Sequence, residues 1–437
     1  MGGARVRMTF AGFAACLTLI GLAKSFGGPR QEPGPVDLGK AGVVRVRATT
    51  NLAQAVAIPR KAASLDDENE IAGLARGSTP ELVGWQEAYK LAVIRARAGR
   101  GPLLQSLDPA ALSRQAERLG AADFARFRDD FFARGAFRDP AKEMFALLYR
   151  LQQIDNARHR LAVLEGLKAR FPERSQDQSS GLSRLDVDTL FAAAVKAGEA
   201  LNHQKRQFRD ALDAFKVALG VSMQAAIIPD RKEMAGFHDV FDSVARWECL
   251  PERHPGQLLQ VITLLPELGD VILDGQPLLS AIQVNPDRWE SSLLKAARLA
   301  LENRSDPARK PLDEDARVQL ELQIRRTVRH LFEMRLAYED AKRGYEYAVR
   351  MKDQALERLH APSANGPQTR SSMVEQLVAQ IASLMAFEDR LAELWTTFRA
   401  ERLTLYRELG VLPYSNWKAF YADLTAQQSD AEGMRSN

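Results

Sequence analysis

The sequence predicts a mainly α-helical fold: two internally repeated, long antiparallel helical hairpins with coiled-coil-like packing, together with short helices and few or no β-strands. Apolar residues recur every seven positions in two long segments, and the second segment repeats the first at a displacement of 190 residues (377 − 187). Both segments also end in similar sequences, at 208–221 and 398–411. A duplicated long-helix unit indicates two similar hairpins in one chain. Aromatic residues make up only 7% of the chain, which favours helices joined by Leu and Ala over a large β-sandwich.

The heptad residues define a packing seam on each return helix. The first set is Val187, Ala194, Leu201, Phe208 and Phe215, and the second is Leu377, Leu384, Leu391, Phe398 and Leu405. Two apolar positions per heptad suit packing against one neighbour in a left-handed supercoil. The row four residues further on is interrupted by Lys205, Glu388 and Arg402. We expect these three side chains to lie at the seam edge with their charged ends in solvent.

Residues 1–25 read as a signal peptide or N-terminal anchor, because Arg5 and Arg7 precede a mostly apolar stretch that ends in Ala23-Lys24-Ser25. This predicts an exported protein, whether the segment is cleaved, retained or acylated at Cys16. A fortuitous apolar start is the alternative. Residues 26–80 are rich in Pro, Gly and charge, and we expect them to form a flexible arm.

The first repeat is expected to span 81–220. Trp85–Ala98 has the spacing of a short helix, and further short helices are expected within 109–133. Asp139-Pro140 is a helix-start signal, so the hairpin is predicted to consist of helices at 139–171 and 183–219, with Gly220 as the stop. The turn between them places four residues at the predicted hairpin tip: Gly181, Leu182, Ser183 and Leu185.

A connecting region follows at 221–311, where frequent prolines permit only short elements. Candidate strands lie at 271–273 and 281–284, and a helix is expected at 289–303. The second repeat is expected to span 312–426, with helices at 312–359 and 371–410. Residues 427–437 are expected to form a frayed tail.

Charge and reactive residues argue against several function classes. The net charge of +4 arises from 60 basic and 56 acidic residues, which gives no electrostatic case for nucleic-acid binding. The six histidines are scattered, and Cys16 and Cys249 form no disulfide framework. The chain has no phosphate-binding glycine loop and no nucleophile motif. We therefore expect no catalytic, cofactor or metal site, and no enzymatic activity.

Several segments resemble the TolC-like outer membrane efflux proteins. The likeness is carried by Gly181-Leu182-Ser183 with Leu185 and Val187, by 208–220, by 398–413 and by 301–306. The resemblance implies a passive conduit in the periplasm and outer membrane, a homotrimer, and a separate inner membrane pump that supplies energy. It also implies that the hairpin tip contacts a periplasmic adaptor.

The sequence departs from this family where transmembrane β-strands are expected in each repeat. Such strands need about 9–11 alternating residues each. Here 100–139 reads as helical and charged, and 303–317 leaves little room. The resemblance is thus to a divergent relative that has lost most barrel strands. Two alternatives remain: a periplasmic structural or interaction scaffold without a pore, and, if the apolar start is fortuitous, a cytoplasmic helical scaffold.

Overall fold

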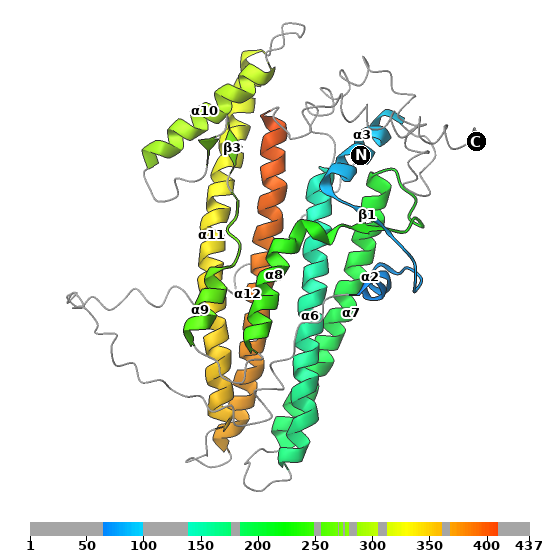
Figure 1. Cartoon of the computed structure of the whole chain (residues 1–437), viewed down its shortest axis with the longest axis vertical. Coiled ribbons are helices and arrows are strands. Elements are labelled where there is room, and N and C mark those ends of the chain that lie inside the picture. The colour runs from blue at the N-terminus through cyan, green and yellow to red at the C-terminus, as the bar shows by residue number, and fades with distance from the viewer. Residues whose placement is uncertain are drawn as a thin grey trace, which may run out of the picture. The chain divides into compact units, whose positions relative to one another are not determined.

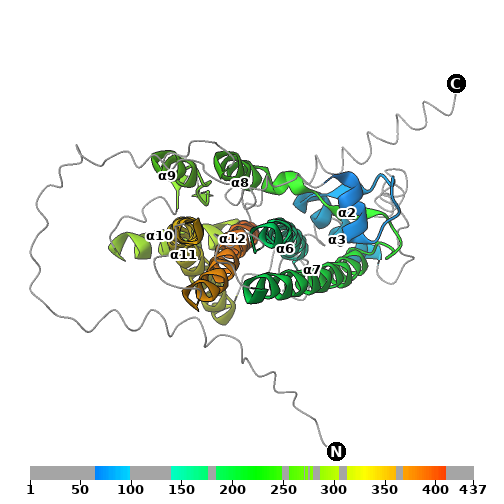
Figure 2. The same cartoon turned by 90° about the horizontal axis from the view of Figure 1, so that it is seen from below.

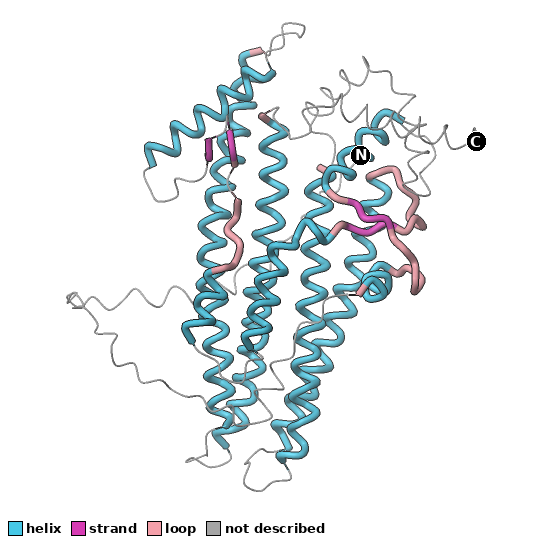
Figure 3. The backbone as a smooth tube through the Cα atoms, in the orientation of Figure 1, coloured by secondary structure: helices cyan, strands magenta, loops and turns pink. Residues whose placement is uncertain are grey.

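The computed structural model describes residues 64–98, 139–175, 184–248, 255–269, 271–273, 276–278, 286–304, 313–360 and 368–409. Helices dominate these residues, and the strands among them are short (Figures 1 and 3). The predicted mainly α-helical class is therefore confirmed. The expected N-terminal segment 1–25, the short helices within 109–133, the strand at 281–284 and the tail lie outside the described residues.

Two long antiparallel hairpins form the centre of the fold. The first consists of α6 (Pro140–Ser175) and α7 (Arg184–Ala218), and the second of α11 (Glu314–His360) and α12 (Gln368–Glu408). α12 packs against α11 on one side and α6 on the other, and it also contacts α7. The four helices thus follow one another in the order α11, α12, α6, α7 (Figure 2).

Local signals explain where the first hairpin begins and ends. The Asp139 side chain accepts a hydrogen bond from the Ala141 backbone N–H at 3.0 Å, and Pro140 occupies the first helical position, where its missing N–H costs nothing. At the other end, Gly220 adopts φ 75°, the left-handed conformation that glycine tolerates best. The Val221 N–H then donates to the Lys216 carbonyl at 2.8 Å, which satisfies a carbonyl that the helix end leaves free.

The core has two hydrophobic clusters, and one of them joins the turn-proximal halves of both hairpins. This smaller cluster draws on all four long helices, including Leu164, Leu190, Leu356 and Leu377. The larger cluster contains the other halves of the four helices and the shorter elements around them. The hairpins therefore share a core along their length instead of folding as separate units.

The seam residues are buried, with one exception. Leu201, Phe208, Phe215, Leu377, Leu384, Leu391, Phe398 and Leu405 are each less than a tenth exposed. Val187 is half-buried against the turn-proximal cluster. The expected solvent exposure of Glu388 is wrong: its side chain is buried, and the Tyr345 hydroxyl donates to its carboxylate at 3.4 Å. Glu388 is covered where α12 packs closely against α11, whereas Arg402 in the same row is only half-buried.

The expected flexible arm also needs correction, because its described part contains a helix. α2 (Leu65–Ala72) begins with a capping box, in which Ser64 and Asp67 each satisfy the other's backbone N–H. It ends at Gly73, which has φ 73°. α2 packs against α7, and Ile71 is fully buried in the larger cluster. Tertiary contacts with a distant helix thus order a segment whose composition suggested a linker.

The remaining elements are short. α3 (Trp85–Ala98) packs on α6, while η4 (Arg231–Met234), α8 (Ala235–Glu248), α9 (Pro255–Thr263) and α10 (Pro286–Arg304) belong to the connecting region. β1 (Glu81–Val83) pairs in parallel with β2 (Ile227–Pro229), and β3 (Ile272–Leu273) pairs antiparallel with β4 (Gln276–Pro277). α8 and α9 lie along one face of the long-helix row (Figure 2).

Candidate functional site

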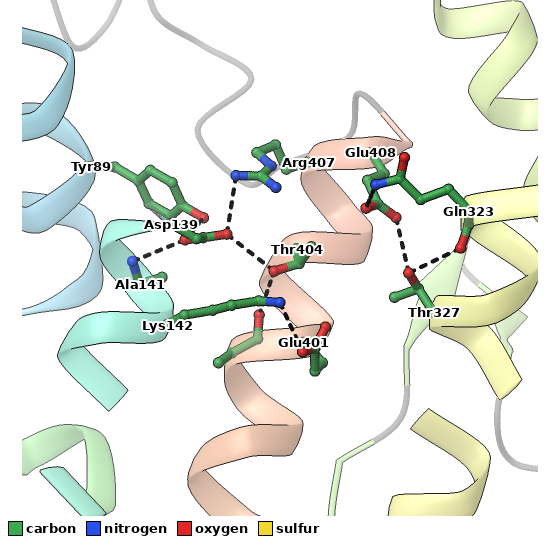
Figure 4. Close-up of polar contacts among 11 residues, drawn as sticks. Tyr89, Asp139, Ala141, Lys142, Gln323, Thr327, Glu401, Thr404, Arg407 and Glu408 are labelled. Carbon is green, nitrogen blue, oxygen red and sulfur yellow. Dashed lines mark hydrogen bonds and ion pairs between the residues drawn. The ribbon is translucent and has the colours of Figure 1, made fainter. Parts of the chain in front are cut away.

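A buried carboxylate joins three helices at the ends of the hairpins opposite their turns (Figure 4). The Tyr89 hydroxyl of α3 donates to Asp139 Oδ1 at 2.9 Å, and the Thr404 hydroxyl of α12 donates to Oδ2 at 3.1 Å. The Arg407 guanidinium, also on α12, lies 3.1 Å from the same Oδ2. We call Tyr89, Asp139, Thr404 and Arg407 the Asp139 clamp.

The chemistry of the Asp139 clamp is that of a structural ion pair. The Asp139 side chain is only 6% exposed, and its two oxygens accept four contacts, including the one from Ala141. Burial and the neighbouring Asp139 charge raise the pKa of the Tyr89 hydroxyl, which therefore stays protonated and acts as a donor. A fully satisfied carboxylate is positioned to hold helices together and is poorly placed to act as a base.

The next residue of α12 makes the corresponding connection to α11. Gln323 donates its side-chain amide to Glu408 Oε1 at 2.6 Å, and the Thr327 hydroxyl donates to Oε2 at 3.3 Å (Figure 4). Burial is the main cause that raises the pKa of Glu408 above its usual value. Consecutive residues, Arg407 and Glu408, thus tie the end of α12 to both of its neighbours.

A chain of polar side chains crosses the middle of the bundle. The His238 ring on α8 contacts Gln152 at 2.8 Å, and Gln152 donates to Asn156 at 2.9 Å. Asn156 then donates to Asp389 on α12 at 2.7 Å. Gln152 and Asn156 are both buried, so these bonds satisfy polar groups that would otherwise be costly. The chain fixes α8, α6 and α12 in one register.

α2 is attached to α7 and η4 by charged contacts. Lys205 Nζ lies 2.7 Å from Glu70, and Arg209 donates to the backbone carbonyls of Ile71 and Glu70 at 3.0 and 2.7 Å. Arg231 lies 2.7 Å from Glu68, whose pKa is raised chiefly by burial. Arg209 therefore supplies a donor to the Ile71 carbonyl at the end of α2 and a second donor to the Glu70 carbonyl, which also accepts from the Gly73 N–H at 3.2 Å.

The predicted interface residues at the hairpin tip are placed only in part. Gly181, Leu182 and Ser183 lie outside the described residues. Leu185 lies in the first turn of α7, and its side chain is 60% exposed. An exposed leucine at a helix start is available for contact with a partner. It takes no part in the polar clusters described above. The contact with an adaptor stays a prediction.

Large apolar side chains are exposed on the two outer helices of the row. Within the described parts of the four long helices, the exposed ones are Leu185, Phe191, Val195 and Val217 on α7, and Val318, Leu336 and Tyr347 on α11. The inner helices, α6 and α12, expose none in those parts. The exposed apolar side chains of the row thus lie on its two outer helices, α7 and α11.

Sequence reasoning missed most of this arrangement. The Asp139-Pro140 signal was visible as a helix start, but nothing in the sequence pairs Asp139 with Thr404 or Arg407. The α2 helix had a readable signal, since Ser64 and Asp67 have capping-box spacing and Gly73 follows at the C-terminal end.

The described residues show neither a metal-binding cluster nor a helix suited to span a membrane. They contain no group of three or more His, Cys, Asp or Glu side chains arranged to hold a metal ion. In the same residues, no helix combines the length and the apolar content that a membrane span requires.

The chain matches no known protein-family profile, and no characterised protein shows significant sequence similarity to it.

Proposed function

We propose that this chain is a TolC-like subunit whose long-helix row forms part of the wall of a passive periplasmic and outer membrane conduit. The observation that carries the proposal is the distribution of apolar surface. α7 and α11, at the two edges of the row, expose large apolar side chains, while α6 and α12 between them expose none in their described parts. A subunit of a closed wall needs apolar surface at both edges, because each edge meets another subunit.

Charge on the edge helices also supports edge-to-edge assembly. α7 runs away from the turns and α11 runs towards them, so low numbers on α7 lie level with high numbers on α11. On that basis Glu199 of one copy lies near the level of Arg343 of the next, and Arg206 lies near Asp340. These four side chains are exposed, and Asp340 and Arg343 also lie 3.6 Å apart as an ion pair within the chain. Opposite charges at matching heights favour one register over others.

By its resemblance the assembly is a homotrimer that works with a separate inner membrane pump and a periplasmic adaptor. Leu185, exposed at the start of α7, and the adjoining tip residues Gly181, Leu182 and Ser183 are the proposed adaptor contact. The subunit itself is proposed to be passive and exported, with no catalytic step of its own.

Cross-linking tests the edge-to-edge assembly. In a background that carries both Cys16→Ala and Cys249→Ser, Val195→Cys and Tyr347→Cys place one thiol on each edge, and both native residues are about 60% exposed. We expect a short bifunctional maleimide to give covalent trimers. The matched control pairs Val195→Cys with Leu294→Cys, which is exposed on α10, and should stay monomeric. Equal cross-linking of both pairs would show that the edges are not the interface.

Conductance distinguishes a conduit from the pore-free scaffold. The scaffold reading is favoured by one observation, the short and charged segments where the family carries transmembrane strands. The purified trimer is expected to give channels in planar bilayers if the conduit proposal is right. A pure trimer without channels would establish the scaffold instead. Fractionation addresses the cytoplasmic alternative, because a cytoplasmic protein that retains its apolar start would exclude export.

A further inference from the structure

An aromatic cluster beneath α8 contains two buried polar atoms with no protein partner. Tyr338 on α11 is fully buried, and Trp395 on α12 is 8% exposed. Neither the Tyr338 hydroxyl nor the Trp395 Nε1–H has a hydrogen-bond partner among the described residues. Buried donors of this kind usually have a partner, since leaving one unsatisfied costs its full desolvation penalty.

The two orphaned groups belong to one packed unit. The Tyr338 and Trp395 rings are 6.4 Å apart between centroids, and Phe237 of α8 covers Trp395 at 6.0 Å. Phe241 extends the cover, with its ring 4.8 Å from Phe237 and 5.6 Å from Tyr345. Rings on helices α8, α11 and α12 thus pack together around the Tyr338 and Trp395 side chains.

The charges around this cluster favour a neutral occupant. Lys342 Nζ lies 5.8 Å from the Tyr338 ring centroid, but it is paired with Glu339 at 3.0 Å. The Arg399 guanidinium lies 5.9 Å from the Trp395 ring centroid, and it is paired with the Glu233 carboxylate at 3.3 Å. Both cations are already compensated, and burial raises the pKa of the Tyr338 hydroxyl, which indicates an environment that disfavours charge.

We propose that the Tyr338 hydroxyl and the Trp395 Nε1–H together hold one neutral oxygen acceptor beneath α8. Two sources offer this chemistry: an internal water, and the carbonyl oxygen of a small neutral molecule. An oxygen with two lone pairs satisfies both donors at once, as buried waters commonly do. The inference does not depend on the proposed function, because the site is enclosed by side chains of a single chain.

The direction in which one substitution shifts the melting temperature tests the proposal. Tyr338→Phe removes only the hydroxyl. If the hydroxyl holds an acceptor, the variant loses that bond and melts at a lower temperature than the parent. If the hydroxyl is an unpaired buried group, its removal relieves a penalty and the variant melts at a higher temperature. Tyr89→Phe is the control, because its hydroxyl has a known acceptor in Asp139 and its loss lowers the melting temperature.

Trp395 supplies the second measurement. In protein with ¹⁵N-labelled indole groups, the Trp395 Nε1–H resonance, assigned by Trp395→Phe, is expected to exchange slowly with solvent and to shift in Tyr338→Phe. A raised or unchanged melting temperature overturns the proposal, and so does a Trp395 resonance that Tyr338→Phe leaves in place.

Acetophenone distinguishes the two sources, with ethylbenzene as a probe of similar shape that lacks the oxygen. A melting temperature raised by acetophenone alone, and only in the parent protein, assigns the site to a small carbonyl compound. No effect of either probe, with a cross-peak between water and the Trp395 N–H, assigns it to water. Equal stabilisation by both probes would reveal an apolar cavity and overturn the assignment to an oxygen acceptor.

Discussion

The Asp139 carboxylate at the start of α6 lies 3.1 Å from the Arg407 guanidinium near the end of α12, although the two residues belong to different repeats. The contact joins the first helix of one hairpin to the last helix of the other. Because the Asp139 side chain is 6% exposed, its charge depends on this pair and on Tyr89 and Thr404 for compensation. The Asp139–Arg407 pair thus adds a buried ionic contact to the hydrophobic core that the two hairpins share.

Removing the carboxylate is expected to destabilise the fold strongly. Asp139→Ala leaves Arg407 unpaired and deletes the cap of α6, so we expect a loss of about 3–5 kcal/mol in the free energy of unfolding, measured by urea denaturation. Lys142→Ala is the control, since Lys142 forms its 2.8 Å pair with Glu401 while 42% exposed. That surface pair should contribute about 1 kcal/mol or less. Similar losses in both variants would contradict the role of the Asp139 clamp.

Gly344 and Gly198 lie inside α11 and α7, and we expect opposite effects when alanine replaces them. A Cβ at Gly344 would lie 2.1 Å from Phe387, so Gly344→Ala overpacks the second hairpin at a cost of about 1–3 kcal/mol. A Cβ at Gly198 meets nothing within 4 Å, and Gly198→Ala should gain roughly 0.5–1 kcal/mol through helix propensity. Chemical denaturation of both variants compares the signs of the two changes in the free energy of unfolding. Adding Phe387→Leu should restore part of the stability that Gly344→Ala loses.

The two equivalent seam phenylalanines should contribute similarly to stability. Phe208 and Phe398 are each 1% exposed, and truncating either to alanine leaves a cavity in the larger cluster. We expect a loss of about 3–5 kcal/mol in each variant. Val195→Ala, which alters an exposed side chain of α7, should change the monomer by roughly 0.5 kcal/mol at most. Unchanged melting of either Phe variant would mean that the seam does not pack as described.

Docking of α2 should depend on Arg209. Arg209→Gln removes two charged hydrogen bonds to the backbone carbonyls of Glu70 and Ile71, each of a kind that contributes about 1.5–3 kcal/mol. Amide hydrogen exchange in α2 should therefore accelerate by roughly tenfold or more, while α12 stays protected. Arg206→Gln, an exposed position three residues earlier on α7, serves as the control. Equal acceleration in both variants would indicate that the positive charge of α7, and not the two Arg209 hydrogen bonds, holds α2 in place.

The raised pKa of Glu408 predicts a particular pH dependence. Burial makes the folded protein bind the Glu408 proton more tightly than the unfolded chain, whose pKa is near 4.5. Stability should therefore decline as the pH rises from 4.5 through the folded-state pKa, and Glu408→Gln should reduce this decline. The pKa values of Glu68 and Glu233 are also raised, so part of the decline in stability should remain in Glu408→Gln. Thermal melting across pH 4–8 checks the result, with Glu401→Gln as the matched variant. A slope that Glu408→Gln leaves unaltered would contradict the assignment.

The amino-acid sequence by itself determined the long helices. Their apolar heptads, the Asp139-Pro140 start and the Gly220 stop act within one or two turns of helix, so they can be read without knowing the fold. The same applies to the expected helix at Trp85–Ala98 and the strand at 271–273, which the structure contains as α3 and β3. The capping box of α2 was equally local and was missed only because the surrounding composition suggested a linker.

Only the tertiary structure decided which helices meet and which charges are buried. Arg407 finds Asp139, Asn156 finds Asp389, and β1 pairs with a strand far along the chain. The close packing of Phe387 against Gly344 and the burial of Glu388 likewise arise where α11 and α12 approach each other. Such contacts depend on the packing of residues that are distant in sequence. Heptad spacing predicts only that a helix packs against another helix. The position of that partner follows from how the whole core is filled.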